Sequence, residues 1–217
     1  MPVRSYRQHC PLAHALDLLG ERWTLLVLRE LLHGPRRYSE LLEGLPSIGT
    51  NLLAARLRLL VSESLIERVE LTPGIDAYSL TANGRALEDA LVALARFGAR
   101  RMGTRRGGSS IQLSSILLAL KAARAPDASQ DLDEEYQFEI DGAPLHARIR
   151  GGVLHVDSGA AAFPVLVLRT DKETFVSLMS GELSPSAAAA SPAVDLAGAP
   201  ATLERCARVL GWSSGAS

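Results

Sequence analysis

Cysteine is scarce in this chain. Cys10 and Cys206 are the only two among 217 residues, and they stand nearly two hundred positions apart. Zinc sites need Cys or His ligands at short, regular spacings, and disulfide-stapled domains need several cysteines. The sequence therefore predicts neither a zinc site nor a disulfide framework.

Long apolar runs are also missing. No window reaches the run of about 18 apolar residues that a transmembrane helix requires. The segment from Met1 to Gln8 carries Arg4 and Arg7 with no apolar stretch behind them, which is not the pattern of a secretory signal peptide. These absences favour a cytoplasmic protein without a membrane partner.

The motifs of catalysis and cofactor binding are absent as well. No Ser/His/Asp or Cys/His set stands at motif spacing, and none of the five histidines belongs to an array such as HExxH. The pairs Gly107-Gly108 and Gly151-Gly152 do not follow a strand and open a helix, as phosphate-binding loops do. We therefore expect no enzyme, no metal site and no cofactor.

What the chain does have is an uneven distribution of charge. Residues 1–107 hold 15 arginines, no lysine and 11 acidic residues, a net charge of +4, whereas residues 108–217 hold 8 basic and 13 acidic residues, a net charge of −5. The first half can meet a polyanion such as DNA, and the second half would be repelled by one.

The stretch 38–60 predicts two short helices joined by a tight turn. Gly44 and Pro46 end the first helix, and Ser47 is placed to cap the second. The apolar residues of the second helix recur at the spacing of a single buried face: Leu53, Leu57 and Leu60.

The opposite face of that second helix suits insertion into the major groove of DNA. Its first turn carries Thr50 and Asn51, which we expect at base edges, and arginines follow that reach phosphate. An ordinary amphipathic helical hairpin would show the same pattern. The candidate DNA-binding residues are Arg36, Arg37, Ser47, Gly49, Thr50, Asn51, Ala55, Arg56 and Arg58.

The sequence that follows favours the DNA-binding alternative. Two apolar runs, 61–71 and 77–81, flank a Pro73-Gly74 turn and predict a β-hairpin. Helix, helix and hairpin in this order predict a winged helix-turn-helix. A further helix is expected over residues 83–101.

Several motifs, in order and spacing, resemble those of the HxlR-type winged-helix transcription regulators. They are Cys10-Pro11, Leu16-Asp17-Leu18-Leu19-Gly20, Arg22-Trp23, Gly34-Pro35, Tyr38-Ser39-Glu40-Leu41, Arg56-Leu57, Leu65-Ile66-Glu67-Arg68 and Tyr78-Ser79-Leu80-Thr81. The resemblance covers about residues 8–100 and implies a homodimer that binds double-stranded DNA, with terminal helices that pair. One departure is Ile75-Asp76 in the hairpin, where family wings often carry a basic residue.

The second half predicts a helix, a sheet and further helices. We expect a helix over 110–125, strands over 135–140, 145–150, 153–157 and 164–169, helices over 172–179 and 184–190, a strand over 193–196 and a last helix over 201–210. The whole chain is therefore predicted as α+β, with an antiparallel-rich sheet in its second half.

This second half, roughly 110–212, resembles the sterol-carrier-protein-like fold, an α/β sandwich. The residues that carry the resemblance are 153–159, 171–175, 179–185 and 194–198. The resemblance implies a cavity between sheet and helices that holds a small hydrophobic effector. Plain core packing uses the same residue types. The candidate cavity walls are Leu117, Phe138, Phe163, Phe175, Leu178, Met179 and Trp212.

The sequence thus predicts a DNA-binding and dimerisation domain at 1–103, a Gly/Arg-rich linker at 104–110 and a ligand-binding domain at 111–217. The predicted function is a homodimeric, sequence-specific transcription regulator controlled by an apolar ligand. Two alternatives stay open. One is a hydrophobic-ligand carrier. The other is a thiol sensor, because HxlR-like regulators can use the cysteine at the position of Cys10 to sense oxidants or electrophiles, and Arg7 and His9 nearby suit a reactive thiol.

Overall fold

The computed structural model describes residues 5–102, 110–123 and 131–212. The chain divides into two compact units, Met1–Leu91 and Val92–Ser217. The boundary falls inside helix α6 (Glu88–Ala99). Of the linker predicted at 104–110, residues 104–109 lie outside the described part of the chain. The predicted α+β class is confirmed.

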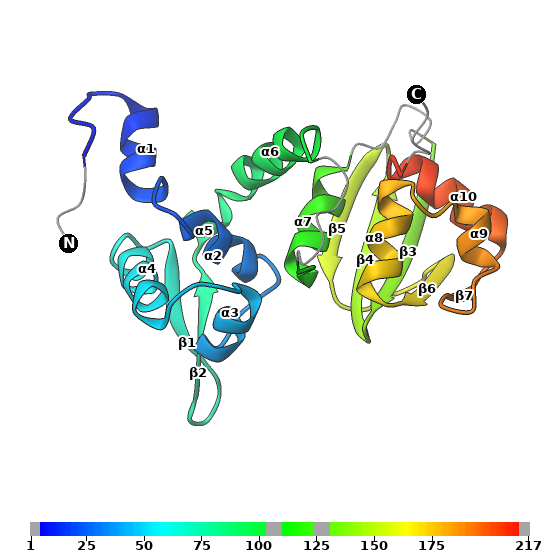
Figure 1. The fold of residues 1–217 in the computed structure, drawn as a ribbon, viewed down its shortest axis with the longest axis horizontal. Helices are drawn as coiled ribbons and strands as arrows, with labels where there is room; N and C mark the ends of the chain where they lie inside the picture. Colours follow the sequence, from blue (N-terminus) through cyan, green and yellow to red (C-terminus); the bar gives the residue numbers. More distant parts are fainter. Residues whose placement is uncertain (1–4, 103–109, 124–130, 213–217) are drawn as a thin grey trace. The chain divides into compact units, whose positions relative to one another are not determined.

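The first unit is a helix-turn-helix followed by a hairpin, as predicted (Figure 1). Helix α4 contacts strand β1, and α2 contacts both α3 and β2, so one small core joins the helices to the hairpin. The elements are α1 (Pro11–Leu19), α2 (Thr24–Leu31), α3 (Tyr38–Gly44), α4 (Thr50–Ser62), β1 (Ile66–Thr72), β2 (Ile75–Leu80) and α5 (Ala82–Arg85).

The hairpin turns at Pro73-Gly74, where Gly74 adopts φ +82°, a conformation that glycine reaches without strain. The helix predicted over 83–101 is divided into α5 and α6. Thr81 caps α5 by accepting a hydrogen bond from the Gly84 N–H at 3.1 Å. A Cβ on Gly84 would lie 2.0 Å from the Leu65 carbonyl oxygen, so this close approach of α5 to the hairpin requires glycine.

The second unit contains a five-stranded sheet in the order β5-β4-β3-β6-β7. Strands β3 and β6 at its centre are parallel, and every other neighbouring pair is antiparallel. The elements are α7 (Leu113–Ala122), β3 (Asp133–Ile140), β4 (Ala143–Arg150), β5 (Val153–Ser158), β6 (Leu166–Thr170), α8 (Lys172–Ser180), α9 (Pro185–Ala189), β7 (Asp195–Ala197) and α10 (Pro200–Val209).

One face of this sheet is buried and the other is polar. Alternate residues of β3, namely Tyr136, Phe138 and Ile140, are fully buried in a core that α7, α8, α9 and α10 complete. Their neighbours in sequence face the other way, and Glu139 on that side pairs with Arg169 at 2.8 Å. The single apolar face explains why α7, α8, α9 and α10 pack on the same side of the sheet (Figure 1).

Candidate DNA-binding site

Helix α4 has one buried and one exposed face. Leu53, Leu57 and Leu60 are at most 1% exposed, because they recur at the helical period and pack into the first unit. Asn51 and Arg58 are exposed on the opposite side, and Thr50 is exposed at the start of the helix. Ala55 lies between them and is half-buried, so its small side chain leaves the exposed face open to a close neighbour.

The start of α4 differs from the prediction. The N-cap residue is Gly49, and no side chain caps the helix, so the prediction that Ser47 caps it is wrong. Ser47 instead adopts φ +75° inside the turn, which the Ile48 N–H closes on the Leu45 carbonyl at 3.1 Å. Ser47 is therefore part of the turn before α4 and not the cap of the helix.

A tyrosine fixes the first turn of α4 in place of a cap. The Tyr38 hydroxyl, on α3, donates a hydrogen bond to the Thr50 carbonyl at 2.8 Å. The contact joins residues twelve positions apart, and no local sequence pattern would reveal it. This bond sets where α4 begins relative to α3.

Arg36 and Arg37 lie where α3 begins. The backbone of Arg36 pairs with that of Tyr78, with N···O distances of 2.9 and 2.8 Å, so strand β2 holds this segment. Arg37 donates its backbone N–H to Glu40 at 2.7 Å and its guanidinium at 3.1 Å. The backbone N–H of Arg37, followed by the ion pair, lowers the pKa of the Glu40 carboxyl below its usual value.

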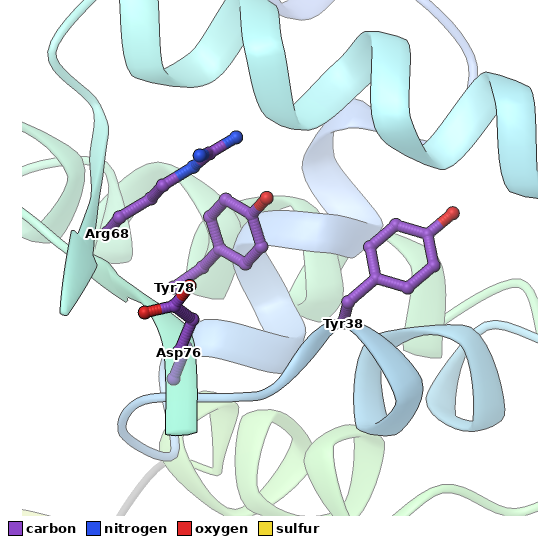
Figure 2. Close-up of a pocket in the computed structure, with 5 residues that line it drawn as sticks. Tyr38, Arg68, Asp76 and Tyr78 are labelled. Atoms are coloured by element: carbon purple, nitrogen blue, oxygen red, sulfur yellow. The ribbon is translucent and has the colours of Figure 1, made fainter. Parts of the chain in front are cut away.

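A hollow of about 230 Å³ lies beside these residues, against the side of the hairpin. Figure 2 shows the Arg68 guanidinium beside the ring of Tyr78, with Asp76 below it, and the Tyr38 ring on the other side. The centre of the Arg68 guanidinium lies 5.8 Å from the Tyr78 ring centroid. Sequence reasoning passed over Arg68, although it is the one basic residue of β1 and β2.

Arg56 differs from the other arginines of this surface. Its Nη2 lies 3.3 Å from the Glu21 carboxylate, and its side chain is only 14% exposed. Glu21 belongs to the turn between α1 and α2. Arg56 is therefore directed back into its own unit, whereas Arg58 is exposed.

The predicted cavity walls of the second unit are mostly core residues. Leu117, Phe138, Phe175, Leu178 and Trp212 are buried in one cluster, and Met179 is partly buried against it. Phe163 is 86% exposed, so the prediction that it lines an interior wall is wrong. It lies in the connection between β5 and β6, where its backbone N–H bonds Glu135 at 3.0 Å and its ring is left outside.

The two cysteines differ in their exposure. Cys10 occupies the N-cap position of α1 and is partly exposed, whereas Cys206 is fully buried, and burial raises the pKa of the Cys206 thiol well above its usual value. Within the described ranges no cluster of three His, Cys, Asp or Glu residues is placed to hold a metal ion. Nor does that part of the chain contain a helix long and apolar enough to span a membrane.

The first unit is similar to known regulators. Residues 18–106 match the family model described as HxlR-like helix-turn-helix. The uncharacterized HTH-type transcriptional regulator sll1512 of Synechocystis is 44% identical over 92 residues, which are 41% of this chain and 67% of that protein. The HTH-type transcriptional regulator YodB of Bacillus subtilis is 40% identical over 82 residues, 36% of this chain and 73% of YodB.

Coverage differs among the relatives. The match spans about half, 54%, of the uncharacterized regulator Mb3122 of Mycobacterium bovis, at 45% identity over 39% of this chain. The solved structure of reduced YodB is 31% identical, with a TM-score of 0.39, over 46% of this chain and 100% of that one. With the order of helices and hairpin seen in the first unit, the sequence matches establish that the chain belongs to the HxlR family of helix-turn-helix transcriptional regulators.

Proposed function

We propose that the protein is a sequence-specific, homodimeric DNA-binding regulator. The observation that carries this proposal is helix α4, which a leucine row holds on one side and which exposes Asn51 and Arg58 on the other side and Thr50 at its start. Helix-turn-helix proteins place such a helix in the major groove with its first residues at base edges.

The candidate residues of this surface divide into three chemical classes. The Asn51 amide can bond an adenine edge through both its donor and its acceptor, and Thr50 stands beside it on the first turn. Arg36, Arg37 and Arg58 supply positive charge for phosphate, which sets affinity without reading sequence. Ser47, Gly49 and Ala55 are small and let the backbone approach the groove. The exposed acid Asp76 argues for little contact from the hairpin tip.

Homodimer formation is supported by apolar side chains left exposed on two helices. Leu12 and Leu16 of α1 are 67% and 41% exposed, and Leu94 and Phe97 of α6 are 52% and 58% exposed. Exposed apolar groups on neighbouring turns of a helix are typical of an interaction surface. A two-fold dimer would present two α4 helices to half-sites about 34 Å apart.

A binding titration tests the DNA proposal. We would select duplexes from a random-sequence library and measure the Kd of the best one by fluorescence anisotropy, with a scrambled duplex of equal length and composition as the control. We expect discrimination of at least about 10³-fold and a Kd that weakens steeply with salt. Equal affinity for the two duplexes would contradict sequence-specific binding, and a monomer by native mass spectrometry would contradict the dimer.

For the second unit we propose a sterol-carrier-like role as sensor of a small hydrophobic effector. Its support is an apolar cluster between one sheet face and the helices, in which the Phe138, Phe175 and Trp212 rings lie 5.2 to 5.6 Å apart. The buried Trp212 Nε1 has no hydrogen-bond partner in the described part of the chain. A buried donor left unpaired is costly, and an acceptor on a ligand that entered this cluster would relieve the cost.

Native mass spectrometry of freshly purified protein tests the sensor proposal, because a retained apolar ligand adds its mass to the folded protein. The extracted ligand should shift the Kd for DNA by about 5–150-fold, the usual range of coupling between two sites. A retained ligand without DNA binding would instead indicate a hydrophobic-ligand carrier.

A thiol sensor is the second candidate function, favoured by the position of Cys10. This thiol is partly exposed at a helix N-terminus, whereas Cys206 is enclosed. Helix N-termini are common places for reactive cysteines. Treating the protein with a thiol-alkylating electrophile and measuring its affinity for DNA tests this function, with Cys10→Ser as the variant that should no longer respond and Cys206→Ser as the matched control.

A further inference from the structure

The recognition helix α4 is tied to the turn between α1 and α2 by one ion pair. The Arg56 Nη2 donates to the Glu21 Oε2 across 35 positions of sequence. The Arg56 side chain is 14% exposed, and its Nε is buried with no hydrogen-bond partner in the described residues. A guanidinium in this position has little surface left to offer a phosphate, because the group that bears the charge already faces a carboxylate.

The turn that carries Glu21 has several contacts that define its backbone. The Gly20 N–H bonds the Leu16 carbonyl at 2.8 Å, and a Cβ at Gly20 would lie 2.5 Å from that oxygen. Trp23 has φ +78°, a conformation that bulky residues rarely adopt. The Arg22 guanidinium lies 5.3 Å from the Trp23 ring centroid. These contacts define the backbone conformation from which the Glu21 side chain reaches Arg56.

We infer that Arg56 is a positioning residue rather than a phosphate contact: together with Glu21 it sets the rotation of α4 about its axis. The inference rests on the proposed DNA-binding function. Thr50 and Asn51 lie one to two helical turns before Arg56 on the same rigid helix. A rotation of α4 that moved Arg56 would therefore move both side chains away from base edges, while Arg58 and the other surface cations would still reach phosphate.

A phosphate contact and a positioning pair predict different results. Losing a phosphate contact weakens all DNA equally and lowers the magnitude of the log Kd against log salt slope by about one. Losing a positioning pair weakens the selected duplex more than a scrambled one and leaves the salt slope unchanged. Removing Glu21, Arg56 or both should also give the same loss of affinity for the selected duplex. The effects of two residues that act through one contact do not add.

The experiment compares Glu21→Gln, Arg56→Gln, the double variant, and the charge exchange Glu21→Arg with Arg56→Glu. Arg58→Gln is the matched control on the same helix. Each full-length protein is titrated by anisotropy against the selected and the scrambled duplex at several salt concentrations. Thermal melting of each variant checks that it is folded, and Glu21→Gln is the safest of them because the Glu21 side chain is 47% exposed.

We expect either single change, and the double change, to raise the Kd for the selected duplex by about three- to tenfold with an unchanged salt slope. The charge exchange should recover most of that loss, and Arg58→Gln should lower the slope. The inference is overturned if Glu21→Gln binds as the wild type does, whether or not Arg56→Gln lowers the slope. Wild-type protein that does not discriminate the two duplexes would contradict the proposed function itself, which is a separate outcome.

Discussion

The two units of the chain use different kinds of core. Within the described residues, the buried hydrophobic side chains of the first unit are all aliphatic, with leucines such as Leu28, Leu41 and Leu57 spread over its helices and the hairpin. The second unit concentrates its largest buried side chains in Tyr136, Phe138, Phe175 and Trp212. In the second unit the Phe138, Phe175 and Trp212 rings all contact one another, so removing one ring also removes contacts of the other two.

The largest expected effect is a loss of stability in the second unit alone. Phe138→Ala removes a fully buried ring that contacts both Phe175 and Trp212, and should cost about 3–5 kcal/mol of unfolding free energy. Calorimetry should show the transition of the second unit lowered and that of the first unchanged.

The matched control for this change is Phe163→Ala in the same unit. Phe163 is 86% exposed, so its removal should change the free energy of unfolding by less than about 0.5 kcal/mol. A comparable loss from both phenylalanines, or a single transition that moves as one, would contradict two separately cored units.

A smaller effect is expected in the first unit, on recognition rather than stability. Asn51→Ala should reduce the discrimination between selected and scrambled duplexes by about 1–3 kcal/mol, because the proposed bidentate contact to a base edge would be lost. The exposed position of Asn51 means that the melting temperature should stay near that of the wild type. Anisotropy and calorimetry on the same sample measure both. Uniform weakening on every duplex would assign Asn51 to the backbone of DNA instead.

A helix cap in the second unit gives an acid-sensitive contribution to stability. The Asp171 side chain accepts the Thr174 backbone N–H at 2.8 Å, and this bond lowers the pKa of the Asp171 carboxyl below its usual 3.8. A lowered folded-state pKa means stabilisation that is present above pH 3.8 and lost as the pH falls through the folded-state pKa. Asp171→Ala should cost about 1 kcal/mol at pH 7 and less below pH 3.8.

Asp171→Asn is the control for this cap, since an amide caps helices nearly as well and does not titrate. Urea unfolding at pH 7 and pH 3 separates the two variants. In the first unit, Glu40 accepts the Arg37 N–H at 2.7 Å and its pKa is lowered in the same direction. Both carboxylates should therefore stabilise their unit more at pH 7 than at low pH. A stability that changed with pH in opposite directions in the two units would contradict this.

The smallest effect is expected where the second unit carries an exposed ion pair. Arg150 and Asp133 lie 3.6 Å apart with side chains 69% and 61% exposed, so solvent screens their attraction. Arg150→Ala should change the unfolding free energy by less than about 0.5 kcal/mol in urea titrations. A larger loss would show that the polar face of the sheet contributes to stability as the aromatic core does.

Periodic patterns predicted the secondary structure well in both units. The strands predicted at 135–140 and 145–150 correspond to β3 and β4, and the Pro73-Gly74 turn located the hairpin, because each depends on neighbours along the chain. The predicted strand at 135–140 is observed at Asp133–Ile140. The sterol-carrier-like cavity and the individual DNA contacts stay predictions.

What sequence reasoning missed lies in contacts between distant residues. The ion pair of Arg56 with Glu21, the bond from Tyr38 to Thr50 and the exposure of Phe163 all depend on how elements pack. The capping role of Ser47 was predicted wrongly, because the periodicity of a helix does not reveal that the residue before it adopts a left-handed conformation in a turn. Local rules thus locate the surface that would meet DNA, and tertiary packing decides which of its side chains remain available.

The parallel pairing of β3 with β6 has a consequence for the synthesis of the protein. Tyr136 pairs with Leu166, so β3 keeps one edge unpaired until about thirty further residues have left the ribosome. At about 5–20 residues per second this takes a few seconds. The hairpin of the first unit needs no such wait, because only Pro73 and Gly74 separate strand β1 from its partner β2. The nascent chain should thus fold its helix-turn-helix first and carry an open, aggregation-prone strand edge until β6 emerges.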